Sequence, residues 1–282
     1  NKDNLNIKFV LHVGDITQSN VAKEWQVSKD AMSSLDQANL PYVLSTGNHD
    51  YEMTGASNGN TKNRNTLFNN YFPLSNYQNK PWFGGVYSAE PNRLDNSYHK
   101  FEINGQKWLI LSLEFGPRNE VIEWANQIVS NHPNHKVILL THAYLYGDNT
   151  RYDWKSKGSK QGSNPHSYKI SKTTNNVNDG EELWQKLVSK HKNFVMTFNG
   201  HVIKPHNFWF NGDGYRSDAT SFGNLVHQML VNYQFARVDG KRKTGYLRIL
   251  KISDGDKVTV KDYSPVLDKY NKKQEKEFSL KK

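Results

Sequence analysis

Short apolar runs alternate with longer segments of mixed polarity in the first part of the chain. Residues 8–13 and 42–46 are apolar runs of strand length, whereas 21–40 carries apolar residues at spacings that fit a helical period only loosely. This order predicts a strand, a helix and a second strand. Such β-α-β units connect parallel strands.

The rest of the chain continues this alternation. Asn104-Gly105 is a strong signal for a hairpin turn, and Asp254-Gly255 predicts a second turn. The alternation predicts one α/β domain over residues 1–282, because no internal repeat or flexible linker interrupts it. Further strands are predicted at 86–88, 97–103, 108–113, 137–141, 194–199, 225–233, 246–252 and 257–263, and helices at 66–72, 119–129 and 179–190.

Three segments lack these patterns. Residues 51–64 are rich in Gly, Asn and Thr, and we expect a loop that lines the substrate entrance. Residues 143–178 are too long for an ordinary connection, and they form either a lid or a surface insertion without a role. Residues 269–282 are rich in Lys and predict a basic, solvated tail.

Side chains that bind metals follow four of the predicted strands. Asp15, Asn48, His142 and His201 each come within two residues of a strand end. Open α/β sheets gather their ligands at the carboxyl ends of the strands, so we expect these side chains to lie close together. Oxygen and nitrogen ligands of this kind suit Mn, Fe or Zn.

Residues 45–51 read Ser-Thr-Gly-Asn-His-Asp-Tyr and concentrate several reactive groups. Gly47 predicts a sharp turn of the backbone after the strand. His49 offers an imidazole that can move a proton, and Asp50 can orient that imidazole. The alternative for this segment on its own is an Asx-type turn without a chemical role.

The ordered blocks Gly14-Asp15, Gly47-Asn48-His49-Asp50, a His after a strand, and Gly200-His201 resemble the calcineurin-like metallophosphoesterases. The resemblance covers nearly the whole chain. It implies two mixed β-sheets packed as a sandwich and flanked by helices. It also implies metal-dependent hydrolysis of phosphoesters, by a phosphatase or a phosphodiesterase, at two divalent or trivalent ions of Mn, Fe or Zn.

The resemblance also implies a role for each matching residue. Asp15 is the candidate for the carboxylate that bridges both ions. Asn48, His142 and His201 complete the ligands of one ion. His49 is expected to stabilise the transition state and to protonate the leaving oxygen without binding metal.

The chain departs from the family pattern at both ends of the motif set. The family's opening Asp-x-His block has no match, since only Asp3 and His12 precede Asp15, and we expect that the family's opening strand is missing. The closing Gly-His-x-His block instead reads Gly-His-Val-Ile-Lys-Pro-His. The candidates for the remaining ligand are His206 and His227. We favour His227, which begins a strand, and a structural histidine is the alternative.

Residues 113–118 and 224–234 resemble an exported bacterial branch of the family. This predicts an exported or extracellular protein, with a cytoplasmic location as the alternative. Glu114 and Arg118 follow a strand end, where Arg118 either grips a phosphate or, as we favour, forms a salt bridge at a helix start. Asp213 and Asp218 are expected to form turns in a loop.

Composition narrows the partners. The absence of cysteine excludes disulfides, thiolate metal sites and a cysteine nucleophile. The net charge of +10 would attract nucleic acid, anionic cell wall or phosphorylated substrates, but no basic stretch is interleaved with aromatics. No apolar run reaches the ~20 residues of a membrane span.

We therefore expect a phosphorylated small molecule or a phosphodiester as substrate, and no partner protein is indicated. Nucleic acid is possible but not indicated. The rival functions are a non-catalytic binding module with an incomplete metal site and an extracellular nuclease.

Overall fold

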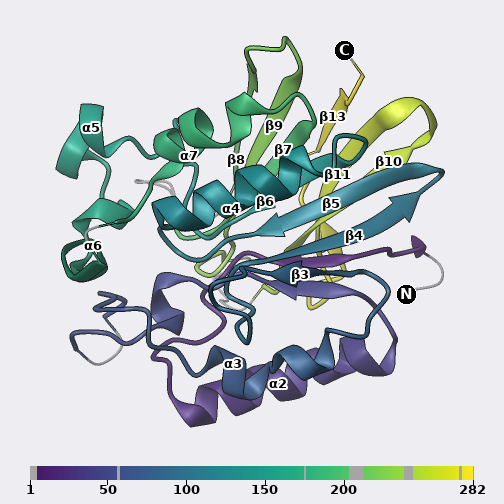
Figure 1. The fold of residues 1–282 in the computed structure, drawn as a ribbon. Coiled ribbons are helices and arrows are strands. Elements are labelled where there is room, and N and C mark those ends of the chain that lie inside the picture. Colours follow the sequence, from purple (N-terminus) through teal and green to yellow (C-terminus); the bar gives the residue numbers. More distant parts are fainter. Residues whose placement is uncertain are drawn as a thin grey trace.

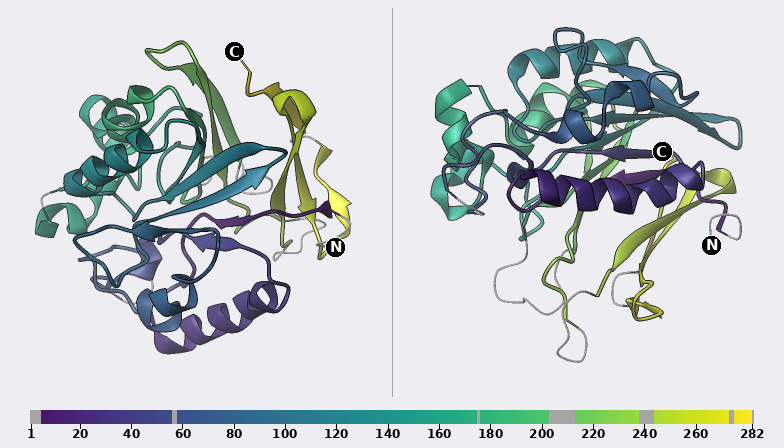
Figure 2. Two further views of the ribbon diagram at one scale, coloured as in Figure 1. Left: turned by 45° about the vertical axis from the view of Figure 1, so that its right-hand side comes forward. Right: turned by 90° about the horizontal axis from the view of Figure 1, so that it is seen from below.

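The computed structural model describes residues 5–55, 58–174, 176–202, 213–237, 244–272 and 275–281. A seven-stranded mixed sheet forms the centre, and a second layer of strands packs on one of its faces (Figures 1 and 2). In spatial order its strands are β3 (Phe83–Val86), β4 (Ser97–Ile103), β5 (Gln106–Ser112), β6 (Lys136–Leu140), β7 (Phe194–Asn199), β9 (Leu225–Val231) and β8 (Asp213–Ala219).

The middle of this sheet is parallel. β5, β6, β7 and β9 run in the same direction, while β3, β4 and β8 pair in the antiparallel sense. Nearly every residue of β6 and β7 is buried, as expected for parallel strands covered on both faces. The carboxyl ends of these two strands therefore meet at one edge, where the candidate ligands His142 and His201 follow them.

The second layer consists of two groups of strands. β1 (Val10–His12) and β2 (Tyr42–Leu44) pair in parallel and are joined by α2 (Ala22–Gln37), which confirms the predicted β-α-β unit. An antiparallel sheet forms the other group. Its strands are β10 (Leu247–Ser253), β11 (Lys257–Ser264), β12 (Lys269–Tyr270) and β13 (Lys276–Ser279).

Both groups share one hydrophobic cluster with the seven-stranded sheet, in which Val43, Ile138 and Val258 are buried. The predicted sandwich is confirmed. Its second layer differs from the single mixed sheet that we expected, because the described strands divide into a parallel pair and an antiparallel sheet.

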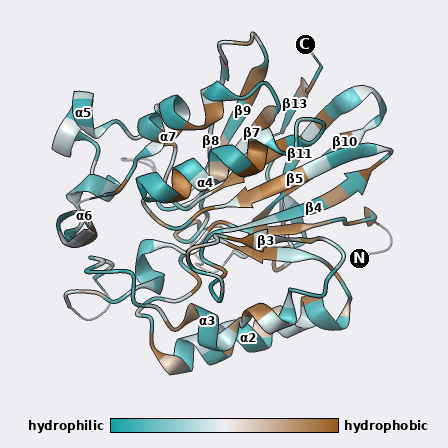
Figure 3. Ribbon diagram, viewed as in Figure 1, coloured by the Kyte–Doolittle hydropathy of each residue, from teal (hydrophilic) through white to brown (hydrophobic). Residues whose placement is uncertain are grey.

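Helices cover the free face of the seven-stranded sheet and the β1–β2 part of the second layer. α4 (Asn119–Ser130) and α7 (Gly180–Lys186) pack on the free face of the seven-stranded sheet. α2 and α3 (Phe68–Tyr71) pack on β2, with Trp25 fully buried between them. Figure 3 shows the resulting pattern, in which the central strands are largely hydrophobic. No helix in the described ranges is long and apolar enough to cross a membrane.

The predicted hairpin at Asn104-Gly105 is confirmed. Both residues have positive φ, 49° and 76°, and they join β4 to β5. The strand expected at 86–88 lies instead at Phe83–Val86, where two glycines let the backbone pass close to the Tyr98 ring.

Two other segments differ from expectation. Asp213 and Asp218 lie in β8 and not in a loop, because β8 pairs along its length with β9 and Arg216 neutralises the Asp218 carboxylate. The segment expected as a basic tail contributes β12 and β13 within its described part. Phe278 of β13 packs into the sandwich and holds this strand on β11.

Candidate metal centre

Three of the predicted ligands converge at the carboxyl ends of β1, β6 and β7. The ligand atoms of Asp15, His142 and His201 all lie within 4.8 Å of one another. His142 Nε2 is 3.2 Å from Asp15 Oδ1, and the two imidazole rings are 4.8 Å apart. The strand order therefore brings together residues that are separated by up to 186 positions (201 − 15) in the chain.

Asn48 lies beside this group. The backbone N–H of the next residue, His49, donates to Asp15 Oδ1 at 3.1 Å. Asn48 Nδ2 donates to the carbonyl of Gly59 at 2.8 Å, which fixes the orientation of the amide. The Asn48 Oδ1 atom is buried and has no hydrogen-bond partner.

The same arrangement recurs at both histidines. His142 Nδ1 lies 2.6 Å from the carbonyl of Val13, and His201 Nε2 lies 2.7 Å from the carbonyl of Ser163. A carbonyl can only accept, so these nitrogens carry the proton, and the other nitrogen of each ring remains as a lone-pair donor. Backbone carbonyls orient metal-binding histidines in this way.

These observations fit a metal ion. The buried Asn48 Oδ1 atom makes no hydrogen bond, and a buried polar atom without a partner costs about 1–3 kcal/mol. His142 Nε2 is also buried and makes no hydrogen bond, and its polar neighbour is the Asp15 carboxylate at 3.2 Å. One carboxylate, one amide oxygen and two imidazole nitrogens form a donor set that suits Mn, Fe or Zn. The site therefore has the chemistry of a metal centre and a reason to hold an ion.

The backbone is strained at two of these residues. Asp15 has φ of 53° and His201 has φ of 75°, in the left-handed region that non-glycine residues rarely occupy. Such strain, of order 1–3 kcal/mol per residue, gathers at functional sites.

The sharp turn that we predicted after Gly47 is present as the 3-10 turn Asn48–Asp50, but the reason for the glycine is its surroundings. Its φ is −101°, so it does not supply a left-handed turn. A Cβ at this position would lie 2.2 Å from Asp15 Oδ1. Glycine is needed here because two loops approach closely.

Electrostatics favours the protonation state that metal binding requires at Asp15 and His201, but not at His142. Burial opposes the charge of Asp15, but His142 holds the pKa of that carboxyl well below its usual range. Burial lowers the pKa of His201 to about 3, with a further contribution from His142. Burial alone would lower the pKa of His142, but Asp15 raises it overall. Asp15 is thus ionised and His201 is neutral near pH 7.

His49 stands outside the ligand group. Its Nδ1 is 2.7 Å from the carbonyl of Gln18, so Nδ1 carries the proton and donates to that carbonyl. The Nε2 atom is left available for proton transfer. This atom packs against Gly59, and a Cβ added to Gly59 would lie 2.4 Å from His49 Nε2.

The expectation that Asp50 orients His49 is wrong. The Asp50 carboxylate instead accepts the backbone N–H groups of Ile16 (3.1 Å), Thr17 (2.8 Å) and Gly47 (2.8 Å). The short 3-10 turn Asn48–Asp50 directs this side chain toward the backbone of the loops that follow β1 and β2. Burial, with Asp15 nearby, raises the pKa of Asp50 to about 6.

The structure does not bring His227 to the Asp15 group. Its ring stacks on Phe278 with centroids 3.8 Å apart, and its Nδ1 is 2.8 Å from the Tyr215 hydroxyl. His227 pairs with Met196, three residues before the end of β7. Strand alternation turns it toward the second layer of strands. His206 and Asp3 lie outside the described residues.

Arg118 forms the salt bridge that we favoured. Its Nε is 2.8 Å from Glu114 and its guanidinium also reaches Glu90 at 2.8 Å. Arg64, which the sequence did not single out, lies 3.2 Å from the same Glu114 and donates to the carbonyls of Phe115 and Gly116. Both guanidinium groups are thus engaged within the protein.

A second group of metal-ligand type, His166, Asp179 and Glu182, has another explanation. Asp179 and Glu182 form the capping box at the start of α7. His166 Nε2 is 2.6 Å from Glu182, and Asp179 also accepts from the backbone of Trp154. These atoms are used in holding the helix start.

Comparison with known proteins agrees with this geometry. Residues 1–205 match the family model of the calcineurin-like phosphoesterases, so the chain belongs to this family of metal-dependent phosphoesterases. It is also similar to an uncharacterized protein, YvnB, of Bacillus subtilis (strain 168), with 31% identity over 294 residues that cover 99% of this chain and 19% of that protein. The chain thus spans about a fifth of the relative's length.

Proposed function

We propose that this chain hydrolyses phosphoesters at a metal centre held by Asp15, Asn48, His142 and His201. One observation carries the proposal. Asn48, His142 and His201 each place one polar atom on a backbone carbonyl, which leaves the other polar atom of each side chain for an ion. On Asn48 that atom, Oδ1, is buried and makes no hydrogen bond. Family membership supplies the reaction class.

Bound metal ions neutralise the phosphoryl oxygens and lower the pKa of water so that hydroxide forms near pH 7. The protein's own contribution is to hold the ligands and to move a proton. Asp15 offers two carboxylate oxygens, which suits a ligand shared between two ions. We propose that such a second ion completes a dinuclear centre, as the family resemblance implies.

His49 is the proposed general acid. The Gln18 carbonyl holds its Nδ1 proton, so the proton given to the leaving oxygen would come from Nε2 of the doubly protonated ring. Because Arg118 and Arg64 are held by Glu114, neither guanidinium is available to grip the phosphate. Of the groups described at the site, bound metal ions and His49 would then neutralise the phosphate charge.

A non-catalytic metal-binding module on the same fold is the second candidate. In the described part of the chain, His227 packs against Phe278 and not beside Asp15. The ligands found together are sufficient for one ion. A single ion could bind there without the second ion that two-metal hydrolysis needs to stabilise both the attacking and the leaving oxygen.

The test is hydrolysis of a chromogenic phosphomonoester and a chromogenic phosphodiester after the purified chain is loaded with Mn²⁺, Fe²⁺ or Zn²⁺. Turnover that requires metal and falls in His49→Asn, which should retain its metal, supports the enzyme. Metal binding without turnover of either substrate supports the binding module. Cleavage of the diester alone, together with single-stranded DNA, favours a nuclease, for which the charge of +10 is the motivation. Export from a bacterial cell stays a prediction.

A further inference from the structure

Three residues of the segment 143–178 contact His201. The Tyr152 ring packs on its imidazole with the centroids 6.0 Å apart, and Ser163 and Tyr168 contact it through polar atoms. The Ser163 carbonyl lies 2.7 Å from His201 Nε2, and the Tyr168 hydroxyl lies 3.5 Å from the same nitrogen. His201 is therefore oriented by atoms that come from the insertion and not from the strands of the central sheet.

Aromatic packing completes this support. The Tyr168 ring meets Phe115 edge-on at 5.1 Å, and Phe115 lies 5.4 Å from the His201 ring and 6.0 Å from the His142 ring. The imidazole of His201 is thus held by a carbonyl at one nitrogen and by rings along its sides.

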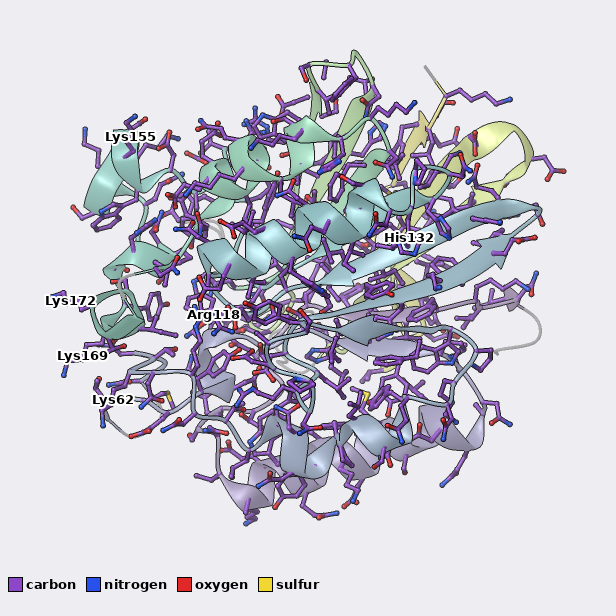
Figure 4. All side chains as sticks on the ribbon, in the orientation of Figure 1. Lys62, Arg118, His132, Lys155, Lys169 and Lys172 are labelled. Carbon is purple, nitrogen blue, oxygen red and sulfur yellow. The ribbon has the colours of Figure 1, made fainter. Side chains whose placement is uncertain are left out.

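The insertion is fastened to the loop that follows the His49 motif. The backbone N–H of Ile170 donates to the carbonyl of Thr61 at 2.9 Å, and Thr173 Oγ1 donates to the carbonyl of Lys62 at 2.7 Å. Thr61 Oγ1 in turn donates to the backbone carbonyl of Asn48 at 2.6 Å. Figure 4 shows Lys62 beside Lys169 and Lys172 on the side where α6 (Lys169–Thr174) meets this loop.

We propose that Ser163 and Tyr168 are positioning residues that direct His201 Nδ1 at the metal, so that the insertion sets the metal affinity of the centre. This inference rests on the proposed metal-dependent function. Partners of this outer kind typically change metal affinity by about 10–100-fold when they are lost. The insertion therefore acts as a fixed wall of the site and not as a removable lid.

Ser163 offers a sharp test because its side chain is exposed and its φ is 64°. Asparagine tolerates this left-handed conformation, whereas a β-branched valine does not. Ser163→Val should displace the carbonyl and weaken Co²⁺ and Mn²⁺ binding by about 10-fold or more. Ser163→Asn, the matched control, should bind as the unaltered chain does.

Tyr168→Phe provides a second variant that removes only a hydroxyl. Its Co²⁺ complex should show shifted visible absorption bands and weaker binding. The control is Tyr144→Phe, because Tyr144 is a buried tyrosine of the same segment whose hydroxyl has no hydrogen-bond partner. Thermal unfolding of each variant without metal shows that it is folded before its affinity is compared.

Calorimetric titration of the full chain, stripped of metal by a chelator, separates the outcomes. If the unaltered chain binds no metal, both the proposed function and this inference fail. If it binds metal and the Ser163→Val and Tyr168→Phe chains bind equally well with unchanged Co²⁺ spectra, this inference alone is overturned. Weaker binding in both variants with unchanged controls supports it.

Discussion

Gly47 and Asp15 lie so close together that a Cβ on residue 47 would be 2.2 Å from the Asp15 Oδ1 atom and 2.4 Å from its backbone nitrogen. A second glycine, Gly14, packs in the same place, where a Cβ would lie 2.4 Å from His142 Nδ1. The loops after β1, β2 and β6 therefore share one small volume. The position of the Asp15 carboxylate depends on the absence of side chains around it.

Gly47→Ala should consequently abolish metal binding, because Asp15 would have to move away from His142. Loss of a residue that only orients a metal ligand typically lowers metal affinity by about 10–100-fold. Because Gly47→Ala would displace the ligand Asp15 itself, we expect a loss of metal affinity of at least about 100-fold. Metal analysis after dialysis measures this. Gly162→Ala is the matched control, since a Cβ there meets nothing within 4 Å. Full metal content in Gly47→Ala would contradict the close-approach argument.

Asp50→Asn should destabilise the fold around the site. The carboxylate accepts three backbone N–H groups and the Thr17 hydroxyl. An amide has one acceptor oxygen, and its NH₂ group would face a backbone donor. We expect a loss of about 2–4 kcal/mol in the free energy of unfolding, measured with urea. The exposed Asp36→Asn is the control, and equal effects of the two changes would show that Asp50 has no special role.

His49→Asn tests the proposed general acid. If His49 gives a proton to the leaving oxygen, kcat should fall by roughly 10²–10⁴-fold while metal content stays the same. The loss should shrink for substrates whose leaving group is a weak base, because such a group needs no proton. Loss of metal from this variant would instead make His49 a ligand.

The ligand residues were predictable from the sequence because each follows an apolar strand. The carboxyl ends of parallel strands meet in space, so Asp15, His142 and His201 could be placed together before the fold was known. Their distances and the free lone pairs could not. These depend on carbonyls of Val13, Gly59 and Ser163, which carry no sequence signal because every residue has one.

The errors have physical causes of the same kind. Asp50 was expected to act on its sequence neighbour His49, but a 3-10 turn directs the two side chains apart. His227 was expected at the site because it begins a strand. On β9 the alternation that buries Val226 toward one layer turns His227 toward Phe278 in the other. Which face a strand residue occupies requires the sheet order, and the sequence alone does not reveal that order.

His99 should make the protein sensitive to mild acid. Burial lowers the pKa of His99 to about 3, and an unfolded histidine titrates near 6.5. As the pH falls below 6.5 the unfolded chain takes up a proton that the folded chain does not. Stability should therefore fall by about 1.4 kcal/mol per pH unit down to about pH 3 because of this group.

The comparison of interest is the unaltered chain with His99→Gln in urea unfolding at several values of pH from 7 to 4.5. The free energy of unfolding of the variant should fall less steeply with decreasing pH, by the slope that corresponds to one proton. At pH 7 the variant should be less stable than the unaltered chain, because a buried ring in contact with Trp82 is lost. Other buried histidines contribute equally to both chains, so the difference reports His99. Parallel curves would exclude this residue as the acid-sensitive group.

The metal stoichiometry is the last prediction. One ion can be held by four protein ligands, Asp15, Asn48, His142 and His201. This is enough for tight binding, because a catalytic zinc has at least three ligands from protein. In the described part of the chain a second ion would share Asp15 and gain no ligand from His227, which packs on Phe278. We therefore expect one tightly held ion and a second ion with an affinity at least roughly 100-fold lower. This difference is larger than the effect of losing one residue that orients a ligand.

Competition with a chelator, followed by metal analysis, counts the ions at each affinity. Millimolar Mn²⁺ should fill the weaker position and raise the hydrolytic rate without changing the tight one. His227→Gln should leave both affinities unchanged, because the ring lies between the strand layers. Two ions held with equal affinity would show that further residues complete the second position, and loss of one ion in His227→Gln would identify this histidine as one of them.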